Sequence, residues 1–290
     1  MIIACIPAFN EGKVIGKLIR NTLQHADNVI VCDDGSTDDT FVEAEKAGAK
    51  VIQHKKNLGK GASMRTLFNF VKNENFDVMI TIDGDGQFSP TEIPTLMTPI
   101  INEKMDVVIG YRSNKDEMPS YRKLGNKFLD SMTNLASELP FRDTQSGFRA
   151  YSKKAISVIS FKTDGFGADS EILIDASRKK LAITEVGVTV NYNTGEKTST
   201  KDPISHTSEV ILSLIESIAI RHPLRYLGIP GLLLTFLGFF FGVWSILIFN
   251  EIRSLPISYF IIGLGGVILG TMLLLVSVVL YSTSKVQSKN

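Results

Sequence analysis

Short runs of apolar residues alternate with helix-like segments through the first part of the chain. The runs are typical of buried strands, and we predict strands at residues 1–6, 29–32, 50–53, 78–82 and 106–111. Between them, the pattern predicts helices after residue 12, up to residue 47, after residue 61 and over residues 91–102. Because most of the strands are apolar along nearly their whole length, the alternation predicts a mainly parallel sheet covered by helices on both faces.

Clusters of polar residues follow the predicted strands. These clusters lie at residues 7–12, 33–38, 57–61 and 83–87, and Arg112 follows the strand at 106–111. The carboxyl ends of parallel strands meet at one edge of a sheet, which is where ligands bind in such folds. We therefore expect a nucleotide-type site at this edge, although the chain has neither a P-loop nor a Gly-x-Gly-x-x-Gly dinucleotide motif.

The segment 81–87 carries the most distinctive of these clusters. Asp83, Asp85 and Gln87 stand at alternate positions, so an extended backbone points them toward a common side. Carboxylate and amide oxygens suit Mg²⁺ or Mn²⁺, and a diphosphate can complete the coordination of either ion. The segment therefore predicts a metal site. An ordinary polar turn is the alternative, because Asp and Gly are also common turn residues.

Two segments near the end of the sequence contain no charged residue. They cover residues 227–249 and 257–281, and each is long enough to cross a bilayer. We predict two transmembrane helices, with buried core helices as the alternative. The connector between them, residues 250–256, is short, so the two helices should form a tight hairpin.

The charges that flank the hairpin predict its orientation. Basic residues stand outside both segments, namely Arg221, His222, Arg225, Lys285 and Lys289, whereas the connector carries Glu251 and Arg253. By the positive-inside rule, the large domain and the tail lie in the cytoplasm, at the cell membrane or, in a eukaryote, at the endoplasmic reticulum membrane. Each segment also has a Gly-x-x-x-Gly pattern, Gly238/Gly242 and Gly266/Gly270, which permits close helix contact and allows an oligomer through these helices.

Apolar residues also recur at helical spacing in two amphipathic segments, residues 121–139 and 205–221. Such helices either lie in the lipid interface or pack on the soluble core. We accordingly divide the chain into a cytoplasmic domain, residues 1–204, an amphipathic interface helix, residues 205–222, and a hairpin with a short tail, residues 223–290.

Composition excludes several other classes of protein. A formal net charge of +1 gives no electrostatic reason to expect nucleic acid as a partner. Cys5 and Cys32 fall in predicted strands, which favours small buried side chains in a reducing compartment. The histidines stand at no spacing that would make a zinc site.

The polar clusters resemble, in order, the motifs of the family-two inverting glycosyltransferases. The matching segments are Pro7-Ala8-Phe9-Asn10-Glu11, Asp33-Asp34-Gly35-Ser36-Thr37-Asp38, Asn57-Leu58-Gly59-Lys60-Gly61, Asp83-Gly84-Asp85-Gly86-Gln87 and Gln145-Ser146-Gly147-Phe148-Arg149. Within that family the chain is most similar to the dolichyl-phosphate mannose synthase and polyprenyl-phosphate glucose synthase group. The resemblance implies a Rossmann-like nucleotide-diphospho-sugar transferase fold.

The resemblance implies a role for several residues on the donor side. Pro7, Phe9 and Glu11 would border the base and ribose, with Phe9 where the family usually has Tyr, and Cys32 and Asp34 would contact the nucleoside. Lys60, Asp83 and Gly84 would contact the nucleotide. Asp85 and Gln87 would ligate the metal, and Arg112 would meet phosphates. Alternatives stay open here. Pro7 could simply end a strand, Phe9 could belong to the core, and Arg112 could be a solvated surface charge.

On the sugar and acceptor side the resemblance implies Gln145, Arg149, Asp169 and Glu171. Asp169 and Glu171 could instead form a helix N-terminus, as a cap and a favourable charge. The arginines Arg112, Arg122 and Arg149 are the candidates for phosphate recognition, and Asp85, Arg112 and Arg122 are the expected catalytic groups.

The segment 191–201 departs from the mannose synthase pattern, in which an Arg precedes the Gly. Lys197 or Lys201 could supply that cation, and this loop, rich in Gly, Ser and Thr, would suit closure over the donor. The expected activity is inverting transfer of a hexose, from a donor of the GDP-mannose or UDP-glucose class, to dolichyl or polyprenyl phosphate.

Two other functions remain as alternatives. A processive polysaccharide synthase usually carries Gln-x-x-Arg-Trp, whereas Gln145 is followed here by Ser-Gly-Phe-Arg and the single Trp is Trp244. A catalytically silent sugar-nucleotide-binding membrane protein would not need the complete set of Asp83, Asp85 and Gln87.

Overall fold

The computed structural model describes residues 1–114, 120–165, 167–191 and 223–287. The chain divides into two compact units, Met1–Leu214 and Ile215–Asn290. The boundaries expected at residues 204 and 222, the amphipathic helix over 205–221, and Lys197 and Lys201 lie outside the described residues.

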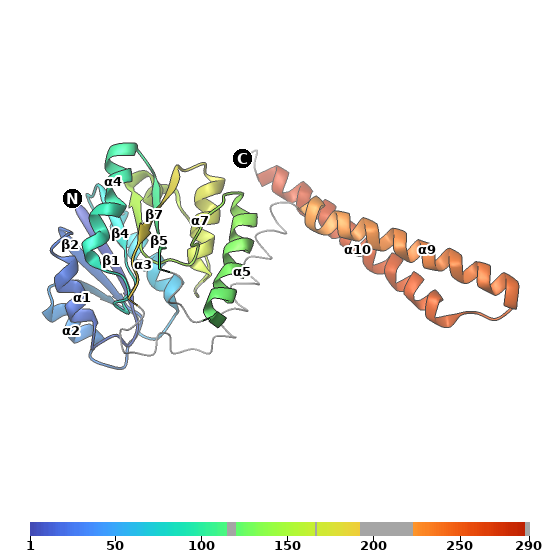
Figure 1. Ribbon diagram of the computed structural model, residues 1–290, viewed down its shortest axis with the longest axis horizontal. Helices are drawn as coiled ribbons and strands as arrows, with labels where there is room; N and C mark the ends of the chain where they lie inside the picture. Colours follow the sequence, from blue (N-terminus) through green and yellow to red (C-terminus); the bar gives the residue numbers. More distant parts are fainter. Residues whose placement is uncertain (115–119, 166, 192–222, 288–290) are drawn as a thin grey trace. The chain divides into compact units, whose positions relative to one another are not determined.

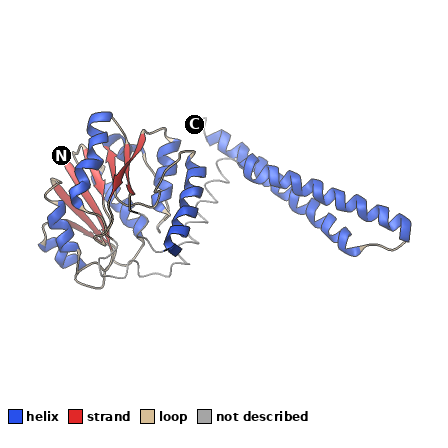
Figure 2. Cartoon of the chain, viewed as in Figure 1, coloured by secondary structure: helices blue, strands red, loops and turns tan. Residues whose placement is uncertain are grey.

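A single sheet forms the centre of the first unit (Figures 1 and 2). Its strands are β1 (Ile2–Ala8), β2 (Asn28–Asp33), β3 (Lys50–Gln53), β4 (Val78–Thr81), β5 (Val107–Arg112), β6 (Arg149–Ser152) and β7 (Ile183–Val188). The spatial order is β3-β2-β1-β4-β6-β5-β7. The strands predicted from the apolar runs are therefore confirmed, with shifts of one or two residues at their ends.

Helices cover both faces of this sheet. They are α1 (Ile15–Thr22), α2 (Thr40–Lys46), α3 (Lys60–Val71), α4 (Ile93–Glu103), α5 (Ser120–Ser137), α6 (Lys153–Val158) and α7 (Ala168–Arg178), with a 3₁₀ turn, η1 (Pro90–Glu92), before α4. Apolar residues of α3, α6 and α7 pack on one face, and those of α1, α2 and α4 pack on the other. This two-sided burial explains why the strands contain so few polar residues.

One strand runs against the others. β6 lies between β4 and β5 and is antiparallel to both, whereas the remaining neighbours are parallel. Its first residue, Arg149, pairs with Thr81 near the carboxyl end of β4. Because an antiparallel strand begins where its parallel neighbours end, the residues just before β6 lie at the carboxyl edge of the sheet.

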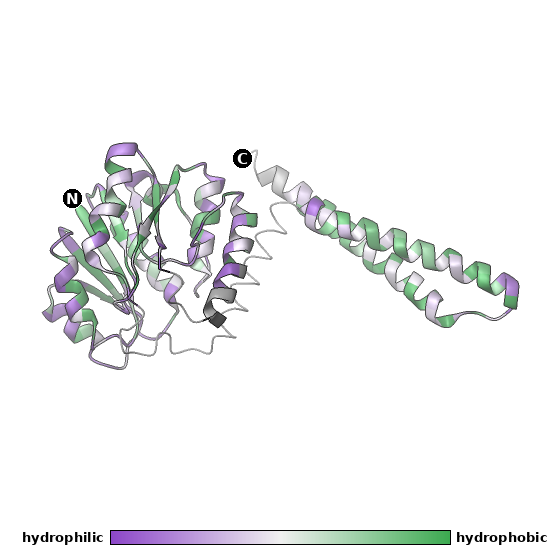
Figure 3. Cartoon of the chain, in the orientation of Figure 1, coloured by the Kyte–Doolittle hydropathy of each residue, from purple (hydrophilic) through white to green (hydrophobic). Residues whose placement is uncertain are grey.

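The second unit is a helical hairpin. A short π-helical turn, η3 (Leu224–Gly228), leads into α9 (Ile229–Ile252), and α10 (Ile257–Gln287) returns alongside it. The segments Leu224–Ile252 and Ile257–Thr283 are long and apolar enough to cross a membrane. Figure 3 shows apolar residues along both helices, and less than a fifth of each segment is buried within the hairpin. This low burial is not what a core helix shows.

Glycines let the two helices of the hairpin touch. A Cβ added to Gly238 would lie 2.5 Å from the Val267 nitrogen, and one added to Gly270 would lie 2.5 Å from the Thr235 nitrogen. A Cβ added to Gly266 would lie 2.8 Å from the Gly238 Cα, whereas a Cβ on Gly242 would meet nothing within 4 Å. The backbone of Gly242 nevertheless lies close to the other helix, 2.7 Å from a Cβ added to Gly263. All four pattern glycines thus lie at the contact inside the hairpin, which weakens their case as an oligomer contact.

Candidate active site

The expected metal segment begins directly after β4 and packs against the end of β1. A Cβ added to Gly84 would lie 3.0 Å from the Pro7 carbonyl oxygen and 3.3 Å from the Ala8 Cβ. Glycine is therefore needed for this close approach. It brings the carboxylates that follow β4 next to the residues that follow β1.

The segment before β6 joins the same edge. Thr81 donates its hydroxyl to the Gly147 carbonyl at 2.9 Å. A Cβ added to Gly147 would lie 2.2 Å from Asp83 Oδ1, so this glycine leaves the space that the Asp83 carboxylate occupies. Gly147 stands in the Gln145–Arg149 motif, yet the pattern alone does not reveal that it contacts Asp83.

Lys60 joins two carboxylates that lie far apart in the sequence. As the first residue of α3, it places Nζ 2.8 Å from Asp83 Oδ1 and 2.9 Å from Asp169 Oδ2. Burial alone would lower the pKa of Lys60, but the attraction of Asp169 and Asp83 outweighs it and raises the pKa above its ordinary value. Lys60 therefore carries a positive charge between the Asp83–Gln87 segment and α7.

Asp85 is the least compensated carboxylate at this edge. Its Oδ1 accepts a hydrogen bond from the Gln87 backbone N–H at 3.0 Å. Burial, reinforced by the neighbouring charge of Asp83, raises the pKa of Asp85 to about 6. The Gln87 carbonyl in turn accepts from Asn191 N–H at 2.9 Å, which fixes the turn from its other side.

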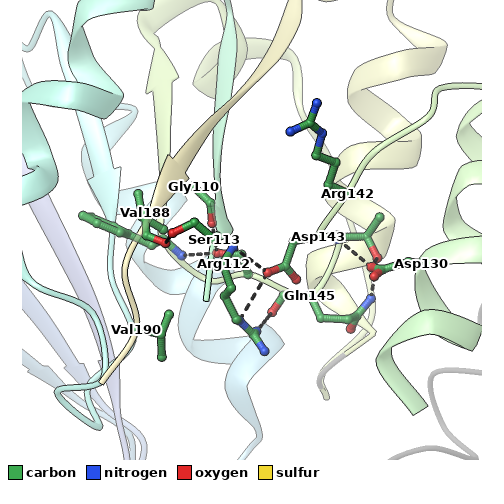
Figure 4. Close-up of polar contacts among 12 residues, drawn as sticks. Gly110, Arg112, Ser113, Asp130, Arg142, Asp143, Gln145, Val188 and Val190 are labelled. Carbon is green, nitrogen blue, oxygen red and sulfur yellow. Dashed lines mark hydrogen bonds and ion pairs between the residues drawn. The ribbon is translucent and has the colours of Figure 1, made fainter. Parts of the chain in front are cut away.

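Arg112, the last residue of β5, reaches the same region. Its Nε lies 3.3 Å from Asp143 Oδ2, and its Nη2 donates to the Gln145 carbonyl at 3.2 Å. Figure 4 shows Arg112 with Asp143 and Gln145. In a separate network, Thr144 donates its backbone N–H to Asp130 on α5, and the Gln145 side-chain amide donates to the Ser170 hydroxyl on α7. Arg112 is mostly buried, so it is not a solvated surface charge.

The part of this edge where the nucleoside is expected is organised around Asp34. Its carboxylate accepts from the backbone N–H groups of Leu58 and Gly59, at 3.0 and 2.7 Å, and lies 2.7 Å from His54 Nδ1. His54 Nε2 lies 2.9 Å from the Thr66 hydroxyl. His54 was not a predicted site residue, because a lone histidine after a short strand gives no sequence signal.

These features match a known family. Residues 3–160, more than half of the chain, match the family model Glycosyl transferase family 2. The chain belongs to this family. The motif resemblance is therefore confirmed, and so is the expectation that the protein is a glycosyltransferase.

Curated relatives of this glycosyltransferase differ in the sugar that their names give. The chain is 34% identical over 216 residues to the UDP-N-acetylglucosamine–dolichyl-phosphate N-acetylglucosaminyltransferase of Methanococcus voltae, covering 66% of this chain and 86% of the relative. It is 27% identical to the dolichyl-phosphate hexose transferase of Haloferax volcanii, covering 72% and 90%.

A solved structure has the same fold. Glucosyl-3-phosphoglycerate synthase from Mycobacterium tuberculosis, in complex with Mn²⁺, uridine diphosphate and phosphoglyceric acid, superposes with a TM-score of 0.60. The match covers 75% of this chain and 78% of that one, at 23% identity. The predicted nucleotide-diphospho-sugar transferase fold is confirmed, and its sheet is mainly parallel as expected, with β6 as the antiparallel strand.

The glycosyltransferase has a carboxylate arrangement that fits a divalent metal. Within the described residues, Asp85 Oδ2 has no hydrogen-bond or ion-pair partner, and no cluster of three or more His, Cys, Asp or Glu side chains surrounds a common point. Mg²⁺ typically takes one or two carboxylates and completes its shell with phosphate and water oxygens. An undercompensated Asp85 suits this kind of site.

Two predicted side chains lie elsewhere than expected. Arg149 is fully buried, and its guanidinium donates to the carbonyls of Ser146, Thr144 and Asp169 at 2.7–2.9 Å. It therefore braces the motif and is not exposed to a phosphate. The Glu171 carboxylate accepts from the Lys162 and Thr163 backbone N–H groups, so it holds a loop rather than facing the sugar side.

The structure also locates four other predicted site residues. Phe9 is half-buried and outside the two core clusters, so part of its ring is accessible. Cys32 is fully buried, and burial raises the pKa of its thiol to about 12, which confirms the buried role. Asp169 lies in the first turn of α7 behind Gly167 and does not cap the helix. Arg122 belongs to α5, but its side chain lies outside the described part of the protein.

Proposed function

We propose that the protein transfers a hexose or related sugar from a nucleotide diphosphate sugar to dolichyl or polyprenyl phosphate, with inversion at the anomeric carbon. The observation that carries this proposal is the meeting of acids and cations at one sheet edge, where Lys60 and Arg112 lie near Asp83 and Asp85. Carboxylates suit the metal of a diphosphate, and cations suit its oxygens. The printed names of the dolichyl-phosphate relatives support the acceptor class.

The donor would lie along this edge in the order of the motifs. Pro7, Phe9, Glu11 and Asp34 would border the nucleoside, with Cys32 offering its backbone because its side chain is buried. Asp83 and Gly84 would follow at the nucleotide. Asp85 and Gln87 would hold Mg²⁺ or Mn²⁺, which supplies Lewis-acid stabilisation to the departing diphosphate when bound.

The residues of the chain would then align the reactants and balance charge. A lipid phosphate is already anionic near neutral pH, so attack needs no strong general base. Lys60 would keep Asp83 and Asp169 fixed, and Asp169 would present its carboxylate to a sugar hydroxyl. Arg112 would bind phosphate oxygens, and Arg122 and Lys201 are further candidate cations.

The hairpin would anchor the enzyme in a membrane, with the catalytic domain in the cytoplasm. The length and apolar surface of α9 and α10 support the anchor, and the basic residues outside the two segments support the orientation. This placement would bring a lipid phosphate to a site that faces cytoplasmic nucleotide sugars.

A transfer assay tests the proposal. Membranes containing the protein are given polyprenyl or dolichyl phosphate, Mg²⁺ or Mn²⁺, and one radiolabelled donor at a time from a panel that includes GDP-mannose, UDP-glucose and UDP-N-acetylglucosamine. The expected result is a single labelled lipid with one of these donors, absent when the variant Asp85→Asn replaces the wild type.

Two outcomes contradict the proposal. A labelled polymer in place of a lipid-linked sugar would identify a processive synthase. Failure with every donor, from a protein that still binds nucleotide sugar, would identify a catalytically silent binding protein.

A further inference from the structure

Arg112 is fixed by Asp143, a carboxylate that was not among the predicted site residues. Asp143 is fully buried, and its Oδ2 accepts the Arg112 backbone N–H at 3.1 Å and faces Arg112 Nε at 3.3 Å. Figure 4 shows Asp143 beside Arg112, while the adjacent Arg142 points away. One carboxylate oxygen therefore fixes both the backbone and the side chain of the same arginine.

These contacts leave one end of the guanidinium available. Nε faces Asp143 and Nη2 donates to the Gln145 carbonyl, whereas Nη1 has no partner among the described residues. A guanidinium held along one side presents its remaining N–H groups in a fixed direction, which suits phosphate oxygens. Asp143 thus holds the Arg112 guanidinium in place without occupying all of its N–H groups, which leaves Arg112 able to bind a phosphate.

Asp143 is itself rigidly placed. The preceding residue, Arg142, donates its backbone N–H to Glu185 on β7 at 2.8 Å. The following residue, Thr144, donates its backbone N–H and its hydroxyl to Asp130 on α5, at 2.8 and 2.7 Å. The backbone on both sides of Asp143 is held, so two elements besides β5, namely β7 and α5, determine where Asp143 meets Arg112.

The second oxygen of Asp143 argues against a purely structural role. Oδ1 is buried and has no hydrogen-bond partner among the described residues. A carboxylate kept only for stability would be expected to use both oxygens, because an unsatisfied buried acceptor costs free energy. Asp106, at the opposite end of β5, does use both: Oδ1 accepts from Ser152, and Oδ2 from Lys154 and Ala182.

We propose that Asp143 is a positioning residue that orients the Arg112 guanidinium toward a phosphate of the substrates. This inference rests on the proposed function, since Arg112 is the phosphate-binding cation in it. Removing a partner that orients a metal ligand typically changes affinity or activity about 10- to 100-fold, and we expect an effect of the same order for a partner that orients a phosphate-binding arginine.

A double-mutant cycle tests the inference. Arg112→Ala, Asp143→Asn and the double variant are compared with wild type for kcat/KM of transfer and for affinity toward inorganic pyrophosphate with Mg²⁺. We expect Arg112→Ala to lower kcat/KM about 100-fold and Asp143→Asn about 10-fold. The double variant should be no worse than Arg112→Ala, because Asp143 acts through Arg112. Asp106→Asn is the matched control, which should lower the urea midpoint and leave kcat/KM per folded molecule unchanged.

Additive losses in the double variant would overturn the inference, and so would wild-type behaviour of Asp143→Asn. If the wild type transfers no sugar from the panel, the proposed function fails, but pyrophosphate affinity across the same variants still decides the role of Asp143. A wild type that neither transfers sugar nor binds pyrophosphate overturns both.

Discussion

The two edges of the central sheet use the same residue type in opposite ways. At the amino edge, Asp106 receives hydrogen bonds from Lys154, Ser152 and Ala182. Burial alone would raise its pKa, but these donors outweigh it and lower the pKa below the ordinary value. At the carboxyl edge, burial and Asp83 raise the pKa of Asp85 to about 6.

The difference separates a structural carboxylate, Asp106, from the carboxylate for which we propose a binding role, Asp85. Donors around Asp106 stabilise its charge, so ionisation contributes to folding. The surroundings of Asp85 disfavour its negative charge, and a bound cation would stabilise that charge where the protein does not. Favourable contacts such as those of Asp106 at the amino edge stabilise the fold, and the fold in turn holds Asp85 at the carboxyl edge although its charge is not compensated.

Exchanging the two carboxylates for amides should produce opposite results. Asp85→Asn should lower metal-dependent transfer by about 10³-fold, because it removes a proposed metal ligand. Its thermal midpoint should stay level or rise, since the amide removes an unfavourable charge. Asp106→Asn should lower the midpoint and keep the activity of the folded enzyme. Transfer assays and calorimetry on both variants measure this, and wild-type turnover in Asp85→Asn would remove that residue from the metal site.

Removing the bridging cation should affect both activity and stability. Lys60→Met leaves Asp83 and Asp169 facing each other without compensation, which should cost about 3 kcal/mol in the free energy of unfolding. Transfer should fall about 100-fold as the carboxylates separate. Urea unfolding and kinetics report the two effects. Adding Asp169→Asn to Lys60→Met should restore part of the stability, and no recovery would show that the bridge is not the cause.

A single methyl group should disturb the carboxyl edge. In Gly147→Ala, the Cβ would lie 2.2 Å from Asp83 Oδ1, so the carboxylate must rotate away from Lys60. We expect transfer to fall on the order of tenfold. Gly187→Ala is the matched control on β7, where the Cβ would lie 3.2 Å from the Tyr111 hydroxyl. Equal kinetics in the two variants would contradict the role of Gly147.

The smallest expected effect is a pH dependence that belongs to one edge alone. Because the pKa of Asp85 is raised to about 6, its proton competes with the metal below that pH. Apparent Mn²⁺ affinity, measured by calorimetry, should be level above pH 6 and should fall by up to about tenfold per pH unit below it.

The same proton should affect the stability of the metal-free protein. The folded state retains this proton to higher pH than the unfolded state does, so the Asp85 contribution to stability should rise as the pH falls from about 6 toward the ordinary pKa of an aspartate. Asp85→Asn should abolish both trends, and a trend that persists would assign it to another group.

The sequence by itself determined the strands, their polar carboxyl ends and the apolar hairpin. Alternation and uncharged length are local properties, and each is written in a few consecutive residues. For this reason the carboxylate turn at Asp83–Gln87 and the phosphate-binding candidate Arg112 could be placed at the ligand edge before any contact was known.

The tertiary structure alone decided which residues complete that edge. The direction of β6 brings Gly147 to Asp83, and Lys60 meets Asp169 across 109 residues. The same fold buries Arg149 and turns Glu171 toward a loop, although the resemblance placed both on the sugar and acceptor side. Residue patterns specify the period of a strand but not its partner or direction, because strand pairing and burial depend on contacts between distant parts of the chain.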